Sequence, residues 1–317
     1  MVTVSLDKNP ELYFDYKKGL DLLRSIKEDH YDYPEEVTFF HVYTEVRTPK
    51  ELLAIKAYLA TQNLSKTKLI VWSDYDISEQ ENIQPYKDFV DFRVYDPKIL
   101  AQGTPLEGVE SHLRTGGDHN HWMSSGVMRF LVLYKFGGIY YDMDMVLLRD
   151  FKPILGLDFA YQWGGSTDFS KKHRWKEDCH GPCAAMLGAV KGSQFIKDCM
   201  ERLIVTPPTG GTCYDEDMLG YVYAERPFTV FPSTFFNTEW LISKTDKHLS
   251  QAIEPQWFDT PLQNVDNLFL EAFAWHWHNS SNKRKEVVGG SKFDLLEKLM
   301  EERLSFKLQD LQEESSL

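Results

Sequence analysis

The sequence has few cysteines, a deficit of basic residues and no long apolar run, and each shortage excludes a class of protein. Its four cysteines, Cys179, Cys183, Cys199 and Cys213, are too few for a disulfide-stabilised scaffold. With 35 basic against 48 acidic residues, the net charge of −13 argues against nucleic acid or an anionic membrane surface as the main partner. A phosphate-bearing small molecule is compatible with this charge, because it requires only a few local cations and a metal.

The chain also lacks the segments that direct a protein to or across a membrane. No apolar run reaches the ~20 residues that a membrane-spanning helix requires. The opening residues, MVTVSLDKNPELYFDY, are charged and do not resemble a secretory signal peptide. From these two features we expect a cytoplasmic protein without a membrane span.

A zinc site is an alternative raised by the spacing of Cys179, His180 and Cys183. A Cys-x3-Cys pattern without a second clear pair is weak support for zinc. Ordinary thiols, or one local disulfide, are the favoured interpretation of these cysteines.

The residues that are present predict a packed α/β protein. Apolar residues make up 42% and aromatic residues 14% of the 317 residues, which is ample for a core. Strands are expected at 37–43, 68–74, 89–96, from 138 onward, 157–163 and 183–190, and helices at 49–61, 124–136 and 193–204. This alternation predicts a mixed, mainly parallel sheet with helices on its faces. Charged helical patterns predict an N-terminal helical extension over 1–36 and a C-terminal helical tail over 283–317, with one domain between them.

The stretch GGIYYDMDMVLL, residues 137–148, places two aspartates in an otherwise apolar run. In a strand, Tyr140, Asp142 and Asp144 would share one face, with alternate positions roughly 6.5–7 Å apart. Two carboxylates at this spacing can bind one Mg²⁺ or Mn²⁺ and leave coordination sites for phosphate oxygens. Without a cation they would repel, and one would be driven towards protonation. The alternative is that both lie solvated, or paired with lysines, at the end of a strand.

The preceding helix favours the first interpretation. In GVMRFLVLY, Arg129 is the only charge among large apolar residues, and a buried guanidinium needs a partner. The strand that carries the aspartates lies directly across the Gly137-Gly138 turn, a good helix C-cap. Arg129 can therefore form a structural bridge to an aspartate, contact a bound phosphate or sugar, or do both. Two other matches, Asp74-Tyr75-Asp76 and Asp215-Glu216-Asp217, look like the beginnings of solvated loops.

Residues 124–151, SSGVMRFLVLYKFGGIYYDMDMVLLRDF, resemble the core of the DXD-type glycosyltransferases of family 32 and the related α-1,4-galactosyltransferases. In that family, a helix bearing an arginine leads through a Gly-Gly turn to Asp-x-Asp. Segments FHVYTEV (40–46), GPCAAMLGAVKGSQFIKDCMERL (181–203), TVFPSTFFNTEW (229–240) and FAWHWHNSS (273–281) are similar to family segments in the same order. The resemblance covers most of residues 37–282.

The resemblance implies a GT-A nucleotide-sugar-binding fold, with residues 37–282 as the catalytic domain. It implies that Asp142 and Asp144 hold Mn²⁺ or Mg²⁺ on the diphosphate of a UDP-sugar, with a late histidine completing the site. His276 matches that histidine best, and His278 is the reserve. The residues expected beside the nucleotide sugar are Phe40, His41, Val42 and Tyr43 in the uridine-binding turn, together with Ser125, Arg129, Tyr140 and Asp142.

The sequence departs from the family pattern in one place. The family usually carries an aspartate three residues before the arginine, and here that position is Gly126. Either Ser125 or Asp118 substitutes for the aspartate, or the donor sugar is held differently. The identity of the donor sugar therefore stays open. Asp144 is the expected catalytic carboxylate, and Asp217 is a candidate general base that would make the reaction inverting. The alternative for Asp217 is a helix-capping or solvated side chain.

These features predict a metal-dependent glycosyltransferase that moves a sugar from a nucleoside-diphosphate donor, UDP being expected, to a glycan or other hydroxyl acceptor. A metal-dependent nucleotidyl- or phosphotransferase is an alternative, but it would want a Gly/Lys phosphate loop, and the sequence shows none. A non-catalytic carbohydrate-binding protein is another. It would use exposed-looking aromatics such as Trp163, Trp175, Trp240 and Trp257. Such a protein would not explain Arg129 together with the aspartates.

Overall fold

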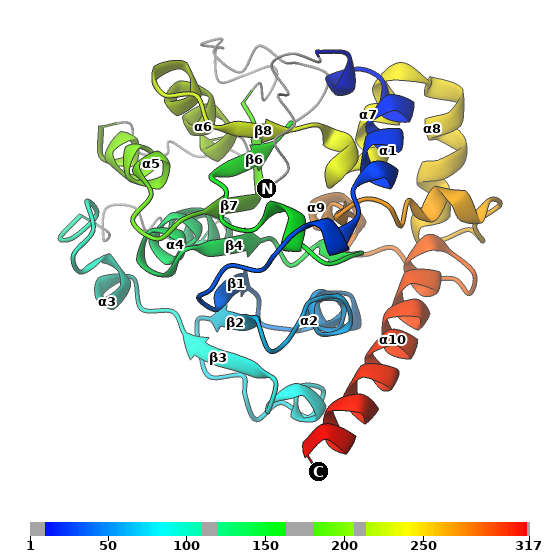
Figure 1. Ribbon diagram of the computed structural model, residues 1–317, viewed down its shortest axis with the longest axis horizontal. Helices are drawn as coiled ribbons and strands as arrows, with labels where there is room; N and C mark the ends of the chain where they lie inside the picture. Colours follow the sequence, from blue (N-terminus) through cyan, green and yellow to red (C-terminus); the bar gives the residue numbers. More distant parts are fainter. Residues whose placement is uncertain (1–9, 110–119, 163–180, 206–213, 316–317) are drawn as a thin grey trace.

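The computed structural model describes residues 10–109, 120–162, 181–205 and 214–315 (Figure 1). A seven-stranded sheet crosses the molecule in the order β3-β2-β1-β4-β7-β6-β8. The strands are β1 (Thr38–Tyr43), β2 (Thr67–Ser73), β3 (Val90–Val94), β4 (Gly138–Tyr141), β6 (Phe159–Tyr161), β7 (Cys183–Ala189) and β8 (Thr229–Phe231). Only β7 runs antiparallel to its neighbours in this sheet. The predicted mixed, mainly parallel sheet is confirmed.

Helices cover both faces of the sheet (Figure 1). One face packs against α3 (Pro97–Ala101), α4 (Asn120–Phe136), α5 (Gln194–Val205) and α6 (Tyr214–Glu225). The other packs against α1 (Tyr16–Ser25), α2 (Pro49–Thr61) and α10 (Lys292–Ser315). Farther along the second face lie α7 (Thr238–Thr245), α8 (Lys247–Ile253) and the short α9 (Asn279–Asn282). None of the described helices is long and apolar enough to cross a bilayer.

Strand β1 contributes side chains to the core on both faces of the sheet. Its alternate residues Phe40 and Val42 join the core under α2, whereas Tyr43 joins the core under α4. His41 is fully buried, and its Nε2 lies 3.1 Å from the Gly137 carbonyl oxygen. Burial lowers the pKa of His41 to about 3, so this imidazole is neutral and links β1 to the turn before β4.

Two glycines set the angle between α4 and β4. Gly137 and Gly138 have φ values of 69° and 98°, which favour glycine. A Cβ atom on Gly138 would stand 1.9 Å from the Phe39 carbonyl oxygen, and one on Gly137 would stand 2.7 Å from the Lys191 nitrogen. The turn therefore brings β4 against β1 at a distance that no other residue permits.

The prediction that one strand runs through both aspartates is wrong, because β4 ends at Tyr141. Asp142 still donates its backbone N–H to the Ala185 carbonyl at 2.8 Å, and then the chain turns, with Met145 N–H donating to the Asp142 carbonyl at 3.0 Å. The next strand, β5 (Met145–Leu147), leaves the main sheet and pairs antiparallel with β9 (Ala274–His276). In this turn the carboxylates reach solvent and hydrogen-bond donors that the interior of a sheet would not offer.

Most predicted elements are confirmed within a few residues, and three features differ. The strand predicted at 157–163 is only three residues long. Residues 215–217 begin helix α6, where a loop was expected. Strands β8 and β9 and helices α3, α7, α8 and α9 were not predicted. Cys183 and Cys199 are buried. The candidate zinc ligands Cys179 and His180 and the remaining cysteine, Cys213, lie outside the described residues.

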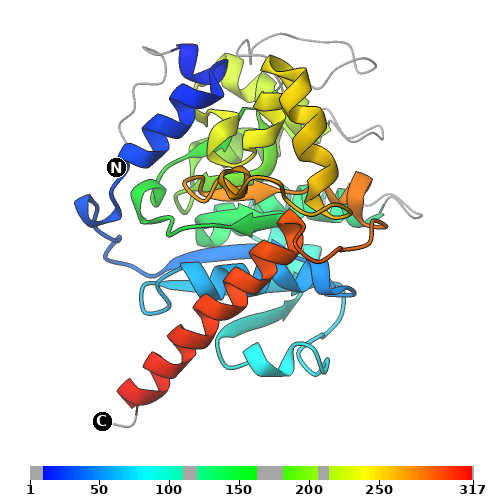
Figure 2. The ribbon, with the colours of Figure 1, turned by 90° about the vertical axis from the view of Figure 1, so that its right-hand side faces the viewer.

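Both ends of the described chain pack on the core. Near the N-terminus, Arg149 donates to the carbonyls of Leu23 and Ile26 at 3.2 and 2.9 Å, which fixes the segment after α1. At the C-terminus, α10 lies diagonally across the face that carries α2 (Figure 2). Lys56 of α2 pairs with Glu301 of α10 at 2.6 Å. The domain boundaries expected at residues 36 and 282 stay a prediction.

Candidate active site

The Asp142–Asp144 turn lies at the carboxyl end of β4, in the middle of the sheet and beside β1. This edge of a parallel α/β sheet is where ligands bind in such folds. Pairing between β5 and β9 places Met145 opposite His276. A segment more than 100 residues away in sequence thus joins the turn, with Trp277 N–H donating to the Asp144 carbonyl at 3.0 Å.

Asp142 is held by a buried arginine and a tyrosine. Its Oδ1 atom accepts hydrogen bonds from Arg129 Nη2 at 3.2 Å and from the Tyr140 hydroxyl at 2.8 Å. Arg129 also donates to the Ala184 carbonyl at 2.6 Å, and its guanidinium lies 4.9 Å from the centre of the Tyr140 ring. The structure thus contains the bridge between Arg129 and an aspartate that was one of the alternatives for this arginine. Contact of Arg129 with a phosphate or sugar stays a prediction.

Asp144 is held by the C-terminal segment. Its Oδ2 atom accepts the Asn279 backbone N–H at 2.7 Å and lies 3.3 Å from His276 Nε2. The other ring nitrogen, His276 Nδ1, is 3.0 Å from the hydroxyl of Tyr161 on β6. The structure therefore brings His276 to the aspartates, as the resemblance implied.

The pKa values of the two carboxylates are shifted in opposite directions. Burial raises the pKa of Asp142 to about 6, with the charge of Asp144 adding to the rise and Arg129 opposing it. Burial alone would also raise the pKa of Asp144. The interactions of Asp144 with His276 and with the Asn279 N–H outweigh the effect of burial, so the pKa of Asp144 is lowered. The protein thus compensates the negative charge of Asp142 poorly, and a bound cation would compensate it.

The donor atoms fit a hard divalent cation. Within the part of the chain that the structure describes, Asp142 Oδ2 and Asp144 Oδ1 accept no hydrogen bond. Two carboxylate oxygens and an imidazole nitrogen form a donor set that suits Mn²⁺. Among the same described residues, no three His, Cys, Asp or Glu side chains already surround a common metal position. His276 Nε2 faces Asp144 instead.

His278 lies on the same side of the site. Its ring centre is 3.9 Å from that of His276, and its Nε2 lies 3.1 Å from Asn237 Nδ2. Its backbone is left-handed, with φ 54°. That conformation costs roughly 1–2 kcal/mol in a residue with a Cβ atom. Burial, followed by the proximity of His276, lowers the pKa of His278 well below its usual value, so the ring is neutral.

Of the four residues expected in the uridine-binding turn, Tyr43 alone brings a described side chain to the edge of the sheet. The side chains of Phe40, His41 and Val42 are fully buried below the edge of the sheet. Tyr43 reaches the carboxyl end of β1, where its hydroxyl donates to Asp74 Oδ1 at 2.6 Å. Contact of these four residues with a nucleotide stays a prediction.

The remaining candidates in helices α4 and α6 lie as follows. The Ser125 carbonyl accepts a hydrogen bond from Arg129 Nε at 3.4 Å, one helical turn away. Asp217 belongs to the first turn of α6, and its side chain lies outside the described part of the structure. Asp118, the alternative to Ser125, also lies outside it.

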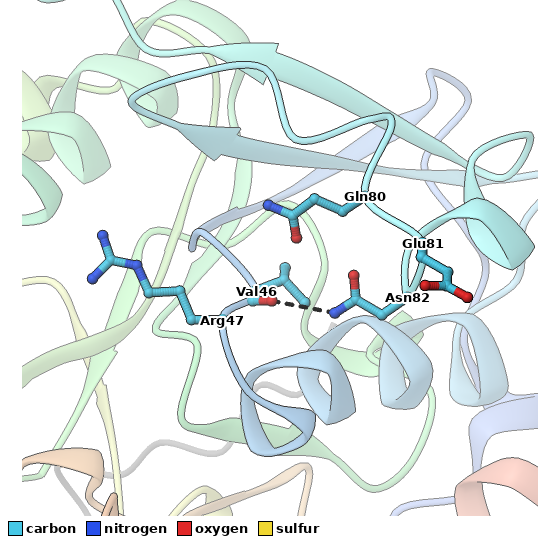
Figure 3. A pocket seen from close by; sticks show the side chains of 5 residues that line it. All are labelled: Val46, Arg47, Gln80, Glu81 and Asn82. Carbon is cyan, nitrogen blue, oxygen red and sulfur yellow. Dashed lines mark hydrogen bonds between the residues drawn. The ribbon is translucent and has the colours of Figure 1, made fainter.

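An open hollow of about 670 Å³ adjoins the carboxyl end of β1 (Figure 3). It is lined by Val46, Arg47, Gln80, Glu81 and Asn82. Val46 has φ 49°, rare for a β-branched residue, and Asn82 Nδ2 donates to its carbonyl at 3.2 Å. Thr44 connects this loop to the aspartate turn, because its hydroxyl lies 3.6 Å from the sulfur of Met143.

Sequence reasoning missed several residues at this edge. Tyr161, Gln80 and Asn82 stand in no motif, and only the fold brings them here. Asn237 lies in the segment 229–240 but was not singled out. Trp257 was expected to be exposed, and this is wrong, because only 4% of it is exposed. It packs with Trp275 and His278. Trp240 is half-buried, and Trp163 and Trp175 lie outside the described residues.

The second Asp-x-Asp match takes no part in the site. Asp76 is exposed, and its Oδ1 accepts the Ser78 N–H at 2.9 Å, so the solvated-loop interpretation is confirmed there. Asp74 is engaged by Tyr43. Of the Asp-x-Asp pairs whose side chains the structure describes, Asp142 and Asp144 alone meet an arginine and a histidine.

Comparison with known proteins agrees with this geometry. Residues 50–160 match the family described as "Glycosyltransferase sugar-binding region containing DXD motif". No curated protein shows significant similarity to the sequence. The glycosyltransferase GlyE of Streptococcus pneumoniae TIGR4 superposes with a TM-score of 0.50 at 11% identity, over 89% of this chain and 64% of GlyE. That likeness shows the fold alone, and this chain spans less than two thirds of GlyE.

Two further solved structures are similar at lower scores. The PaToxG glycosyltransferase has a TM-score of 0.43 at 14% identity, over 69% of this chain and 81% of its own. The bifunctional glycosyltransferase WbbM has a TM-score of 0.48 at 13% identity, over 85% and 52%. The DXD region and the GT-A-type sheet together confirm the predicted resemblance. Residues 50–160 thus resemble the sugar-binding region of DXD-motif glycosyltransferases, and the chain has the fold of a glycosyltransferase.

Proposed function

We propose that this glycosyltransferase is metal-dependent and transfers a sugar from a UDP-linked donor to a hydroxyl group of a glycan or similar acceptor. One observation carries the proposal. Asp142 and Asp144 meet at the carboxyl end of β4, each oriented by its own partners and each with an oxygen that accepts no hydrogen bond from the described residues. This arrangement suits a cation bridged to a diphosphate.

Asp142, Asp144 and His276 would hold the cation. When bound, Mn²⁺ or Mg²⁺ supplies Lewis-acid stabilisation of the negative charge on the departing UDP. His278, whose ring contacts that of His276, is the reserve ligand.

The chain's own residues fix the geometry before any ligand arrives. Arg129 and Tyr140 hold one oxygen of Asp142, so that the other is directed away from them. The Asn279 N–H fixes Asp144 in the same manner. The side chains of Asp142 and Asp144 are 28% and 12% exposed, so little bulk water competes for them. A preorganised site of this kind requires little rearrangement as charge develops.

The donor sugar and the stereochemical course are separate parts of the proposal. Gly126 leaves room in α4 where the family usually has an aspartate, so we assign the sugar's hydroxyl contacts to Ser125. Asp217 at the start of α6 is the candidate general base of an inverting reaction.

Hydrolysis of nucleotide sugars tests the proposal. A panel of UDP-linked hexoses, pentoses and amino sugars is incubated with the protein in Mn²⁺ and in EDTA, and released UDP is measured. We expect one donor to be hydrolysed in Mn²⁺ only, and Asp142→Asn to abolish the turnover. Asp76→Asn, in the solvated Asp-x-Asp, is the matched control and should retain it. Full turnover by Asp142→Asn, or equal turnover in EDTA, contradicts the proposal.

A further inference from the structure

We infer that Tyr161 is a positioning residue for His276, and that its hydroxyl holds the imidazole in the orientation and tautomer that a divalent cation requires. The inference rests on the proposed function, because it concerns a side chain assigned there to the cation. Tyr161 belongs to none of the segments that carry the family resemblance.

Three side chains form a hydrogen-bonded row from the interior of the sheet to the site. Tyr161, the last residue of β6, is fully buried. Its hydroxyl lies 3.0 Å from His276 Nδ1, and His276 Nε2 lies 3.3 Å from Asp144 Oδ2. His276 is thus held from behind by Tyr161 while its other nitrogen faces the carboxylates.

A hydroxyl group suits both states of this histidine. A neutral imidazole has one N–H donor and one acceptor nitrogen. While Nε2 donates to Asp144, Nδ1 accepts, and the Tyr161 hydroxyl donates to it. When Nε2 gives its lone pair to a cation, the ring hydrogen must be on Nδ1, and the Tyr161 oxygen accepts it. A carbonyl oxygen could serve only the second state, and a phenylalanine could serve neither.

Cys183 gives the hydroxyl a second partner. It lies opposite Tyr161 in the pairing of β6 with β7, is buried, and is in hydrogen-bond contact with the Tyr161 hydroxyl. When Tyr161 accepts from His276, its own hydrogen can turn to the Cys183 sulfur. The hydroxyl therefore stays bonded in both states, which a buried tyrosine requires.

Packing alone does not explain a tyrosine at this position. The Tyr161 ring packs against Phe236, with ring centres 5.3 Å apart. Phenylalanine would preserve that contact and the fold, and would lose only the hydrogen bonds. Tyr161→Phe therefore separates a positioning role from a packing role.

Binding of Mn²⁺ alone, followed through the electron paramagnetic resonance signal of the free ion, tests the inference. We expect Tyr161→Phe to bind Mn²⁺ about 10–100-fold more weakly than the unaltered protein, the loss typical of a residue that orients a metal-binding histidine. Tyr141→Phe is the matched control, because Tyr141 is also fully buried but donates to the Ala54 carbonyl, at 3.3 Å. Its Mn²⁺ affinity should stay within about twofold, because the Tyr141 hydroxyl points to Ala54 of α2, on the opposite side of β4 from the Tyr140 side chain that contacts Asp142.

A second pair of variants shows whether Tyr161 acts through His276. In a His276→Ala background, Tyr161→Phe should cause no further loss of Mn²⁺ affinity. An unchanged affinity in Tyr161→Phe, or an equal loss with and without His276, overturns the inference and leaves the metal site standing. If the unaltered protein binds no Mn²⁺, the metal dependence fails, and the inference falls with it.

Discussion

At the scale of single residues, the two aspartates are held by different means and are not interchangeable. Asp142 depends on the buried guanidinium of Arg129, whereas Asp144 depends on a backbone N–H and His276. Burial makes the charge of Asp142 the less favourable of the two. Arg129 is therefore the residue on which that charge depends most.

Replacing Arg129 by methionine should cost about 3–5 kcal/mol of unfolding free energy, because it leaves a carboxylate buried without its cation. Urea denaturation measures the loss. Arg226→Met is the matched control, since Arg226 also pairs with an aspartate, Asp198, but is 58% exposed. Its loss should be about 0–1 kcal/mol. Similar losses for the two variants would show that Arg129 is not a buried partner.

The glycine turn offers a second test at this scale. Gly138→Ala combines a left-handed backbone with a Cβ atom placed against the Phe39 carbonyl. It should lower stability by about 3 kcal/mol or more. Gly156→Ala, where φ is 77° and the added Cβ meets no atom within 4 Å, should cost about 1–2 kcal/mol. A tolerated Gly138→Ala would contradict the close approach of β4 to β1.

At the scale of elements, the C-terminal part of the chain supports the site through β9. Lys292, at the start of α10, is fully buried and pairs with Glu239 of α7. Its ammonium also lies 4.8 Å from the centre of the Trp275 ring in β9. One lysine thus joins α7, β9 and α10, and β9 carries His276 to the aspartates.

Lys292→Met should cost about 3–5 kcal/mol, since it leaves Glu239 buried without a cation. Adding Glu239→Leu should recover most of that loss, because apolar side chains of similar volume replace a buried pair well. Thermal or urea unfolding of the single and double variants measures both changes. A double variant no more stable than Lys292→Met would show that the pair itself, and not the uncompensated charge, determines stability.

Elements differ in how well the sequence predicts them. Strands β1 and β2 are apolar runs rich in β-branched and aromatic residues, and β7 is a short, continuous apolar run, so local pattern was sufficient. The Asp142–Asp144 turn could not be predicted, because the apolar run continues through it and the break depends on pairing of β5 with β9. His276 was found only through family resemblance, and Tyr161 was not found, since their meeting depends on contacts across 115 residues.

At the scale of the whole molecule, the fold brings distant segments to one edge of the sheet. The loop after β1, the turn after β4 and the segment after β9 meet there. The chain carries a net charge of −13, and the side chains at this edge include the carboxylates of Asp142 and Asp144. Such a surface would repel a diphosphate unless a cation lay between them. We therefore expect nucleotide binding to depend on a divalent cation.

Thermal unfolding with UDP measures this dependence. UDP should raise the unfolding temperature of the protein in Mn²⁺ and should not do so in EDTA, because ligands stabilise only the state that binds them. Asp144→Asn should remove the Mn²⁺-dependent rise, while Asp76→Asn should retain it. An equal rise in Mn²⁺ and EDTA, or an undiminished rise in Asp144→Asn, would contradict a cation held between these aspartates and the diphosphate.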